Sequence, residues 1–406
     1  MTKNLRVWAF GLILVWGVAL MAVPTVVITG VGESKTSLST TVRTDGSPGA
    51  GLFMSVLKDN LRRSGWFTVS EGTGGGVRIM GTVSTSGGQC VANLTLQDAR
   101  GNSYPWKKSC RPVADEVRPM AHELNDLIVE RVTGKPGMAS APIIFVGKRG
   151  NTDIWTCDAD GGRLRQVTTE GALCLSPKWL PDRSGFLYTR YTGKRSGTYR
   201  ATFRRGGGVS FDTLTAFPGL NAGAVPSPEG REAAMVLSVS GNVELYAMNL
   251  SSKKLNRITF TPNANEASPC WSPSGSQLAY VSDVSGAPQV YVVAKGSRNG
   301  TRAVNVRGMS ESTSPDWGLD GRIAFCGRKD GTYGIYTTRS GEMPVQVSPK
   351  DGGRYEDPSW APDGRHIVCT RTAGGRRSLL VLDTMGDSPI ELFSVSGNWY
   401  LADWAR

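Results

Sequence analysis

A short pattern centred on Pro-x-Trp recurs through the last two thirds of the chain, and it constrains the fold more than any other feature. Four full copies share this core and a following turn: Pro177–Asp182, Pro269–Gly275, Pro315–Gly321 and Pro358–Gly364. A degenerate copy stands at Val225–Gly230 and a half-copy at Ala402–Trp404. The reference positions 179, 226, 271, 317, 360 and 404 are 47, 45, 46, 43 and 44 residues apart. This spacing is the length of a four-stranded propeller blade.

Runs of β-forming residues follow each copy and give the number of blades. Three similar runs, Ile143–Val146, Ile154–Thr156 and Gln166–Thr168, have no Pro-x-Trp copy before them. The segment that carries Trp404 is the missing piece. We therefore expect it to complete the blade that begins near residue 143 and to close a ring of six blades without open sheet edges.

Turn chemistry explains how each copy ends. In Pro362-Asp363-Gly364 the proline fixes φ, the aspartate bonds nearby backbone, and the glycine accepts a positive φ. A glycine content of 51 in 406 residues agrees with many tight turns. The tryptophan before each turn is expected to be an apolar wedge between blades rather than a platform for a ligand.

The residues before about 140 do not repeat and predict a small α/β domain. Apolar spacing predicts helices over 52–64 and 114–132, and short apolar runs predict strands at 26–28, 67–69, 77–83 and 91–96. Gly72–Gly76 lacks the Lys-Ser/Thr ending of a phosphate-binding loop and is interpreted as a flexible turn. The predicted class is mainly β: a six-bladed β-propeller at 139–406, preceded by a small α/β N-terminal domain at 23–138.

The first 22 residues have the pattern of an export signal. Lys3 and Arg6 precede an apolar run from 7 to 23, and Pro24 follows. This run is near the short end for crossing a bilayer. Cleavage after Ala22 and retention as a membrane anchor both remain open, and either places the rest of the chain outside the cytoplasm.

Seven cysteines are compatible with such a compartment, and the odd number leaves at least one unpaired. Cys90 and Cys110 lie symmetrically about the turn at 98–102, so they could face each other across a hairpin and form a disulfide. The absence of a C-x-x-C motif and the presence of only two histidines argue against a zinc site. We expect no metal and no cofactor.

The formal net charge of +12 raises the question of nucleic-acid binding. The basic residues are scattered, with Arg204-Arg205 and Arg376-Arg377 as the densest pairs, and no aromatic residues are interleaved with them. A solvated surface facing an anionic envelope is therefore the better interpretation.

Two N-terminal segments resemble the TolB family. Ala121–Lys135 is similar to the family's Ala-His-x-x-x-Asp-x-Ile helix and the linker into the first blade, and Leu57–Phe67 is similar to the end of its first helix. With the six Pro-x-Trp blades, the resemblance covers roughly residues 24–406. It implies a monomeric periplasmic adaptor, peripherally associated with the envelope. Its expected partners are a Pal-like lipoprotein and a TolA-like inner-membrane protein, in a system that supports outer-membrane integrity and cell division.

The same resemblance implies where these partners bind. The TolA-binding stretch would be the N-terminal segment Thr25, Val26, Val27, Ile28, Thr29, Gly30, Val31 and Gly32. The Pal face would be formed by residues just before the Pro-x-Trp copies: Asn221, Gly223, Asn265, Glu266, Ser268, Glu311, Ser314, Tyr355, Glu356 and Asp357. Relatives often have His-Asn-Gly-Ala-Pro before the second copy, whereas this chain has Leu220–Ala224 without the histidine.

Catalytic motifs are missing from the sequence, so we expect no enzyme and no catalytic residues. There is neither a Gly-x-Ser-x-Gly elbow nor a His-Glu-x-x-His motif. His122 is interpreted as structural and His366 as a surface or strand residue. Two alternatives stay open: a carbohydrate- or peptidoglycan-binding propeller, and a metal-assisted lyase that uses channel carboxylates such as Asp316, Glu356 and Asp357.

Overall fold

The computed structural model describes residues 34–74, 76–297, 301–302 and 308–406. Its N-terminal part is a five-stranded sheet in the order β2-β1-β3-β4-β5. The strands are β1 (Thr36–Thr44), β2 (Phe67–Glu71), β3 (Val77–Ser86), β4 (Gln89–Gln97) and β5 (Ser103–Cys110). β1 pairs in parallel with β2 and β3, and the remaining pairs are antiparallel. The export signal and the strand predicted at 26–28 lie outside the described residues.

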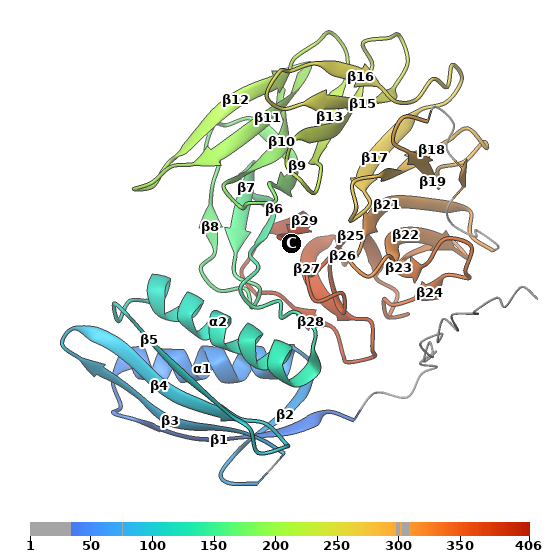
Figure 1. Cartoon of the computed structure of the whole chain (residues 1–406). Coiled ribbons are helices and arrows are strands. Elements are labelled where there is room, and N and C mark those ends of the chain that lie inside the picture. The colour runs from blue at the N-terminus through green and yellow to red at the C-terminus, as the bar shows by residue number, and fades with distance from the viewer. Residues whose placement is uncertain (1–33, 75, 298–300, 303–307) are drawn as a thin grey trace, which may run out of the picture. The chain divides into compact units, whose positions relative to one another are not determined.

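Two helices complete this domain, α1 (Pro48–Arg63) and α2 (Ala114–Thr133) (Figure 1). The Ser47 side chain caps α1 by accepting a hydrogen bond from the Ala50 amide, and Gly134 ends α2 with φ of 70°. Phe53 and Leu57 from α1 pack with Ile128 from α2 and Ile79 from β3 in one buried core. No helix within the described ranges is long and apolar enough to cross a membrane.

The described residues from Ile143 onward form six four-stranded sheets, which confirms the predicted six-bladed propeller (Figure 1). Blade 1 contains β9 (Leu173–Trp179), β10 (Gly185–Thr192), β11 (Arg195–Phe203) and β12 (Val209–Thr215). Blade 2 contains β13 (Asn221–Pro226), β14 (Glu232–Leu237), β15 (Glu244–Asn249) and β16 (Leu255–Arg257). Blade 3 contains β17 (Glu266–Trp271), β18 (Gln277–Ser282), β19 (Gln289–Ala294) and β20 (Thr301–Arg302).

Blade 4 contains β21 (Glu311–Trp317), β22 (Ile323–Lys329), β23 (Thr332–Thr338) and β24 (Val345–Gln346). Blade 5 contains β25 (Arg354–Trp360), β26 (His366–Ala373), β27 (Arg376–Asp383) and β28 (Ile390–Glu391). Blade 6 contains β29 (Asn398–Trp404), β6 (Ile143–Arg149), β7 (Asn151–Cys157) and β8 (Arg165–Gln166).

Blade 6 closes the ring as the sequence predicts. Its innermost strand is β29, which pairs with β6 so that Trp404 lies opposite Ile143. Strands from the two ends of the propeller segment therefore share one sheet. In that sheet β6 has a neighbour on both sides, as does every other inner strand of the blade.

The motif tryptophans divide into two groups. Trp271, Trp360 and Trp404 are buried, as expected of wedges between blades, and the Trp404 indole donates to the Ala141 carbonyl at 2.9 Å. Trp179 and Trp317 are only partly buried. For these two, the prediction of a fully packed wedge holds only in part.

The hairpin of β4 and β5 places Cys90 and Cys110 directly opposite each other, as predicted. Both thiols are free in this structure, so the disulfide that the sequence suggested is not formed. Burial raises the pKa of the Cys90 thiol, which keeps it protonated at neutral pH.

Candidate functional site

Each of the six innermost strands is interrupted by a bulge at the same place. The register shifts once in every pairing between an innermost strand and its neighbour. One residue beside each shift adopts φ between 48° and 61°: Ser176, Gly223, Ser268, Ser314, Asp357 and Leu401. Only Gly223 suits this left-handed region, so five blades hold a residue in a strained conformation. Bulges re-aim side chains, and all six of these residues line one central cavity of about 620 Å³.

Next to the bulges, hydrogen bonds join one blade to the next. The residue directly before the motif tryptophan in one blade accepts a hydrogen bond from the tryptophan amide of the following blade. The four pairs are Asp403 with Trp179 at 2.9 Å, Cys270 with Trp317 at 3.2 Å, Asp316 with Trp360 at 2.7 Å and Ser359 with Trp404 at 3.0 Å. Blade 2 cannot donate in this way because Pro226 stands in the tryptophan position and has no N–H.

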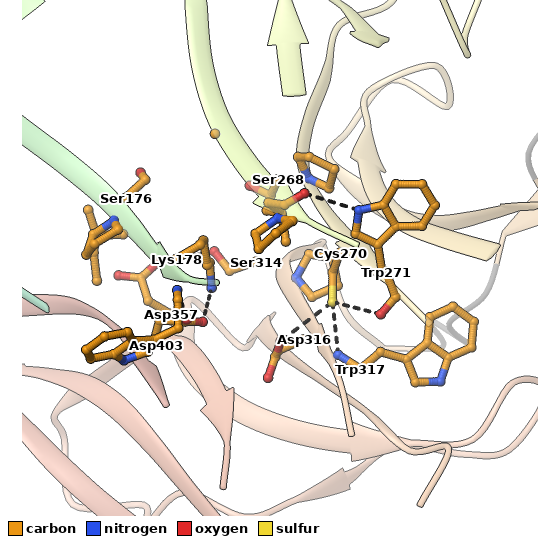
Figure 2. Close-up of a pocket in the computed structure, with 18 of the residues that line it drawn as sticks. Ser176, Lys178, Ser268, Cys270, Trp271, Ser314, Asp316, Trp317, Asp357 and Asp403 are labelled. Atoms are coloured by element: carbon orange, nitrogen blue, oxygen red, sulfur yellow. Dashed lines mark hydrogen bonds and ion pairs between the residues drawn. The ribbon is translucent and has the colours of Figure 1, made fainter. Parts of the chain in front are cut away.

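Two of these acceptors also form ion pairs in the channel wall. Lys178 Nζ lies 2.8 Å from Asp403 Oδ1, and Arg406 Nη2 lies 2.7 Å from Asp316 Oδ1. Burial alone would raise the pKa of Asp316, but the charges of Arg406 and Lys178 outweigh it and hold this pKa below its usual value. Figure 2 shows Lys178 directed at Asp403, and Cys270 between Asp316 and Trp317.

Asp357 differs from the other two channel aspartates because it forms no ion pair with any residue that the structure describes. Its carboxylate accepts hydrogen bonds from Ser314 Oγ at 3.2 Å and Thr370 Oγ1 at 3.4 Å. Burial and the neighbouring charge of Glu356 raise the pKa of Asp357 to about 6. The cavity therefore offers two carboxylates that form no ion pair among the described residues, Asp357 and Glu266, and a positively charged or hydrogen-bond-donating group of a ligand could engage them.

A family model described as the TolB beta propeller domain matches residues 129–406. The chain belongs to the TolB β-propeller family. A relative named Protein TolB homolog from Chlorobium chlorochromatii is 27% identical over 272 residues, which are 63% of this chain and 59% of the relative. A relative of the same name from Chlorobium luteolum is 27% identical over 333 residues, which are 80% of this chain and 73% of the relative.

A solved structure extends the likeness to the N-terminal domain. The crystal structure of TolB from Acinetobacter baumannii matches with a TM-score of 0.80 at 22% identity and covers 93% of this chain and 98% of that one. At this identity the match shows the fold, an α/β domain followed by a six-bladed propeller.

The residues predicted from the TolB resemblance to form the Pal face separate into two sets. The six that line the cavity are Gly223, Asn265, Glu266, Ser268, Ser314 and Asp357. The other four bond to their own blade or to the loop that precedes it: Asn221 to the 217–219 loop, Glu311 to Arg328 and Tyr333, Tyr355 to Asp351, and Glu356 to Arg354. The TolA-binding stretch at 25–32 lies outside the described residues.

Sequence reasoning did not single out Lys178, Cys270, Asp403 or Arg406, all of which line the cavity. A signal for three of them was present, since Lys178, Cys270 and Asp403 occupy the variable position between Pro or Ala and Trp. Comparing that position across the copies would have identified the residues that link the blades.

A second cluster, away from the channel, brings His122, Asp158 and Asp160 close enough to hold a metal ion. Asp158 instead binds Arg118 at 2.9 Å, Arg163 at 2.6 Å and His122 at 3.2 Å, and Asp160 binds Arg118. Because cations already occupy these carboxylates, the cluster is better described as an ion-pair network between α2 and blade 6. This agrees with a structural role for His122.

The two histidines of the chain are not available as catalytic bases. The ring nitrogens of His122 contact Asn60 and Asp158, and those of His366 contact Asp363 and Asp383. No nitrogen is left to activate a serine. His366 was predicted to be a surface or strand residue. It is the first residue of β26, which agrees with the strand alternative, but it is buried and not on the surface.

Proposed function

We propose that the chain is a non-enzymatic periplasmic adaptor of a Tol-Pal type envelope system. The observation that carries this proposal is the combination of the family match over the propeller with a likeness to a TolB structure across both domains. Propellers alone occur in many functional classes, whereas this pairing with an α/β domain is the arrangement of that TolB structure. The lyase alternative loses support because Asp316 and Glu356 already bind Arg406 and Arg354.

In this proposal a Pal-like lipoprotein binds at the channel mouth of the propeller. Four of the six predicted residues that line the cavity stand at the bulges, and two of the six, Asp357 and Glu266, are carboxylates that form no ion pair among the described residues. The cavity wall, held by bonds between blades, is a preorganised docking surface, so little conformational entropy is lost on binding. A TolA-like protein would bind the N-terminal segment 25–32, which leaves the propeller free for its own partner.

Calorimetric titration with the soluble domain of a Pal-like lipoprotein from the same organism tests the proposal. We expect a dissociation constant of about 1 μM or lower, or about −8 kcal/mol. Asp357→Asn should weaken binding by about tenfold or more, because it removes a channel carboxylate that forms no ion pair within the described residues and is free to accept from the partner. Glu391→Gln, on the outermost strand of the same blade, is the matched control and should bind as the unsubstituted protein does.

The result that would overturn the proposal is the absence of binding in calorimetry and in a second, independent assay. The propeller would then be assigned to another envelope ligand, with carbohydrate or peptidoglycan as the next probe. If the domain binds but Asp357→Asn leaves the affinity unchanged, the proposed partner stands and its contact lies outside the channel.

A further inference from the structure

The strand register identifies which side chains share one end of the propeller. In every blade the first residue of the innermost strand lies opposite the last residues of the second strand: Tyr191 faces Leu173, Arg328 faces Glu311, and Lys148 faces Asn398. The hairpin tips that join second to third strands therefore all lie at this end. The contacts of α2 are at the opposite end, because they reach the turn between β7 and β8.

Positive charge gathers on these tips in four consecutive blades. We call the following six residues the basic arc: Lys329 in blade 4, Arg377 in blade 5, Lys148 and Arg149 in blade 6, and Lys194 and Arg195 in blade 1. All six are exposed, and none has a carboxylate partner among the described residues. Arg149 and Arg377 stack on Trp155 and Tyr400, which orients their guanidinium groups and leaves their charge uncompensated.

Acidic side chains at the same end do not neutralise the arc, because most already bind an arginine. Glu170 pairs with Arg190, Glu311 with Arg328, Asp351 with Arg371 and Glu356 with Arg354. Asp330, beside Lys329, is exposed and lacks an ion pair within the part of the chain that the structure describes. The arc thus keeps a clear excess of positive charge.

The tips of blades 2 and 3 are different, which makes the charge one-sided. Residues 238–242 and 282–286 contain no lysine or arginine, and each tip exposes a valine, Val239 or Val284. Charge spread evenly for solubility would appear on all six tips. The restriction of these basic residues to adjacent blades indicates a partner that contacts the propeller on the side of those blades.

We propose that the basic arc binds an anionic phospholipid membrane surface. The six charges are distributed over the tips of four blades, so no small anion can contact them together, whereas a lipid surface presents phosphate groups across the whole arc. Each basic residue near such a surface contributes modestly, and the arc acts through their number. This proposal does not depend on the identity of the protein partner at the channel.

Co-sedimentation of the protein with vesicles tests the proposal directly. The vesicles are phosphatidylcholine alone or with roughly one third phosphatidylglycerol. We expect binding only to the anionic vesicles, and weaker binding at high salt because added ions screen the charges. Two double variants should weaken binding to anionic vesicles, roughly fivefold for each residue changed. They are Lys148→Glu/Arg149→Glu and Lys194→Glu/Arg195→Glu.

Arg204→Glu/Arg205→Glu is the matched control. These two arginines are exposed and without an ion pair in the described structure, and they occupy the turn between β11 and β12 at the other end of blade 1. The control changes the net charge as much as each arc variant but should keep full vesicle binding. Failure to bind anionic vesicles, or an equal loss in the control, would overturn the proposal.

Discussion

The two ends of the propeller use charged residues in opposite ways. The end that contacts the N-terminal domain holds a buried and paired set of charges: Arg365 binds Asp383 at 2.7 Å with side chains 7% and 4% exposed. Arg365 also lies over the ring of Trp66, 4.5 Å from its centroid, and so links blade 5 to the N-terminal domain. At the other end, the six residues of the basic arc are exposed and form no ion pair with any residue that the structure describes.

This difference separates charges that hold the structure from charges that are free to bind. Removing one partner of a buried pair leaves an uncompensated charge inside the protein, which is strongly destabilising. An exposed lysine or arginine is solvated whether or not the chain is folded, so it contributes little to stability. Four predictions test whether the two ends differ as described.

The largest effect is expected for Asp383→Ala. Asp383 is shared by Arg365 and His366, so its loss leaves two buried cations with weaker compensation. We expect the free energy of unfolding to fall by about 3–5 kcal/mol in denaturant titration. Glu391→Ala removes an exposed ion pair with Arg376 in the same blade and should cost at most about 1 kcal/mol. Equal losses in the two variants would contradict the distinction between the ends.

A pH dependence centred on His366 is the second prediction. Burial alone would lower the pKa of His366, but the carboxylates of Asp363 and Asp383 outweigh burial and raise it to about 9. The pKa is higher in the folded than in the unfolded state, so the stabilisation is complete below about pH 6.5 and disappears as the pH rises towards 9.

The expected loss across this window is at most roughly 3 kcal/mol. Thermal unfolding between pH 6.5 and 9 measures it. The variant His366→Gln should be less stable at the lower pH and show a flatter profile. A profile that is unchanged in His366→Gln would assign the dependence to other groups.

The blades could be predicted from sequence because their turn chemistry repeats at a constant spacing. Pro362-Asp363-Gly364 encodes its turn locally, and the pairing of Trp404 with Ile143 follows from counting strands. β1 could not be predicted in this way, because its sequence Thr36–Thr44 is mostly polar and it lies inside the sheet only through pairing with β2 and β3.

The candidate site was harder to predict than the fold. Alternation along a strand assigns side chains to faces, but a bulge shifts that assignment by one residue. Glu311 therefore bonds to its own blade and Asn221 to the loop before it, while Ser314 and Asp357 line the channel. The burial of His366 depends on Asp383, which is 17 residues away in sequence and directly across the sheet.

The third prediction compares the two ends through alanine substitutions at two glycines, which leave the net charge unchanged. Gly65 and Gly374 both have positive φ, 71° and 56°. A Cβ on Gly65 would lie 2.3 Å from the Arg365 guanidinium, whereas a Cβ on Gly374, in the tip of blade 5, would have nothing within 4 Å. Gly374→Ala should cost about 1 kcal/mol from backbone strain alone, and Gly65→Ala about 1–2 kcal/mol more. Similar losses would mean that Arg365 moves aside easily.

The smallest effect is expected for Lys194→Ala/Arg195→Ala in the basic arc. Both side chains are exposed and lack ion pairs in the described part of the chain, so the free energy of unfolding should change by less than about 0.5 kcal/mol. If like charges on the arc repel one another, the variant should be slightly more stable at low salt, and the gain should vanish as salt screens the repulsion. Denaturant titration at two salt concentrations measures both quantities. A loss of several kcal/mol would show that the arc holds the fold together, and its charges could then no longer be regarded as free for a partner.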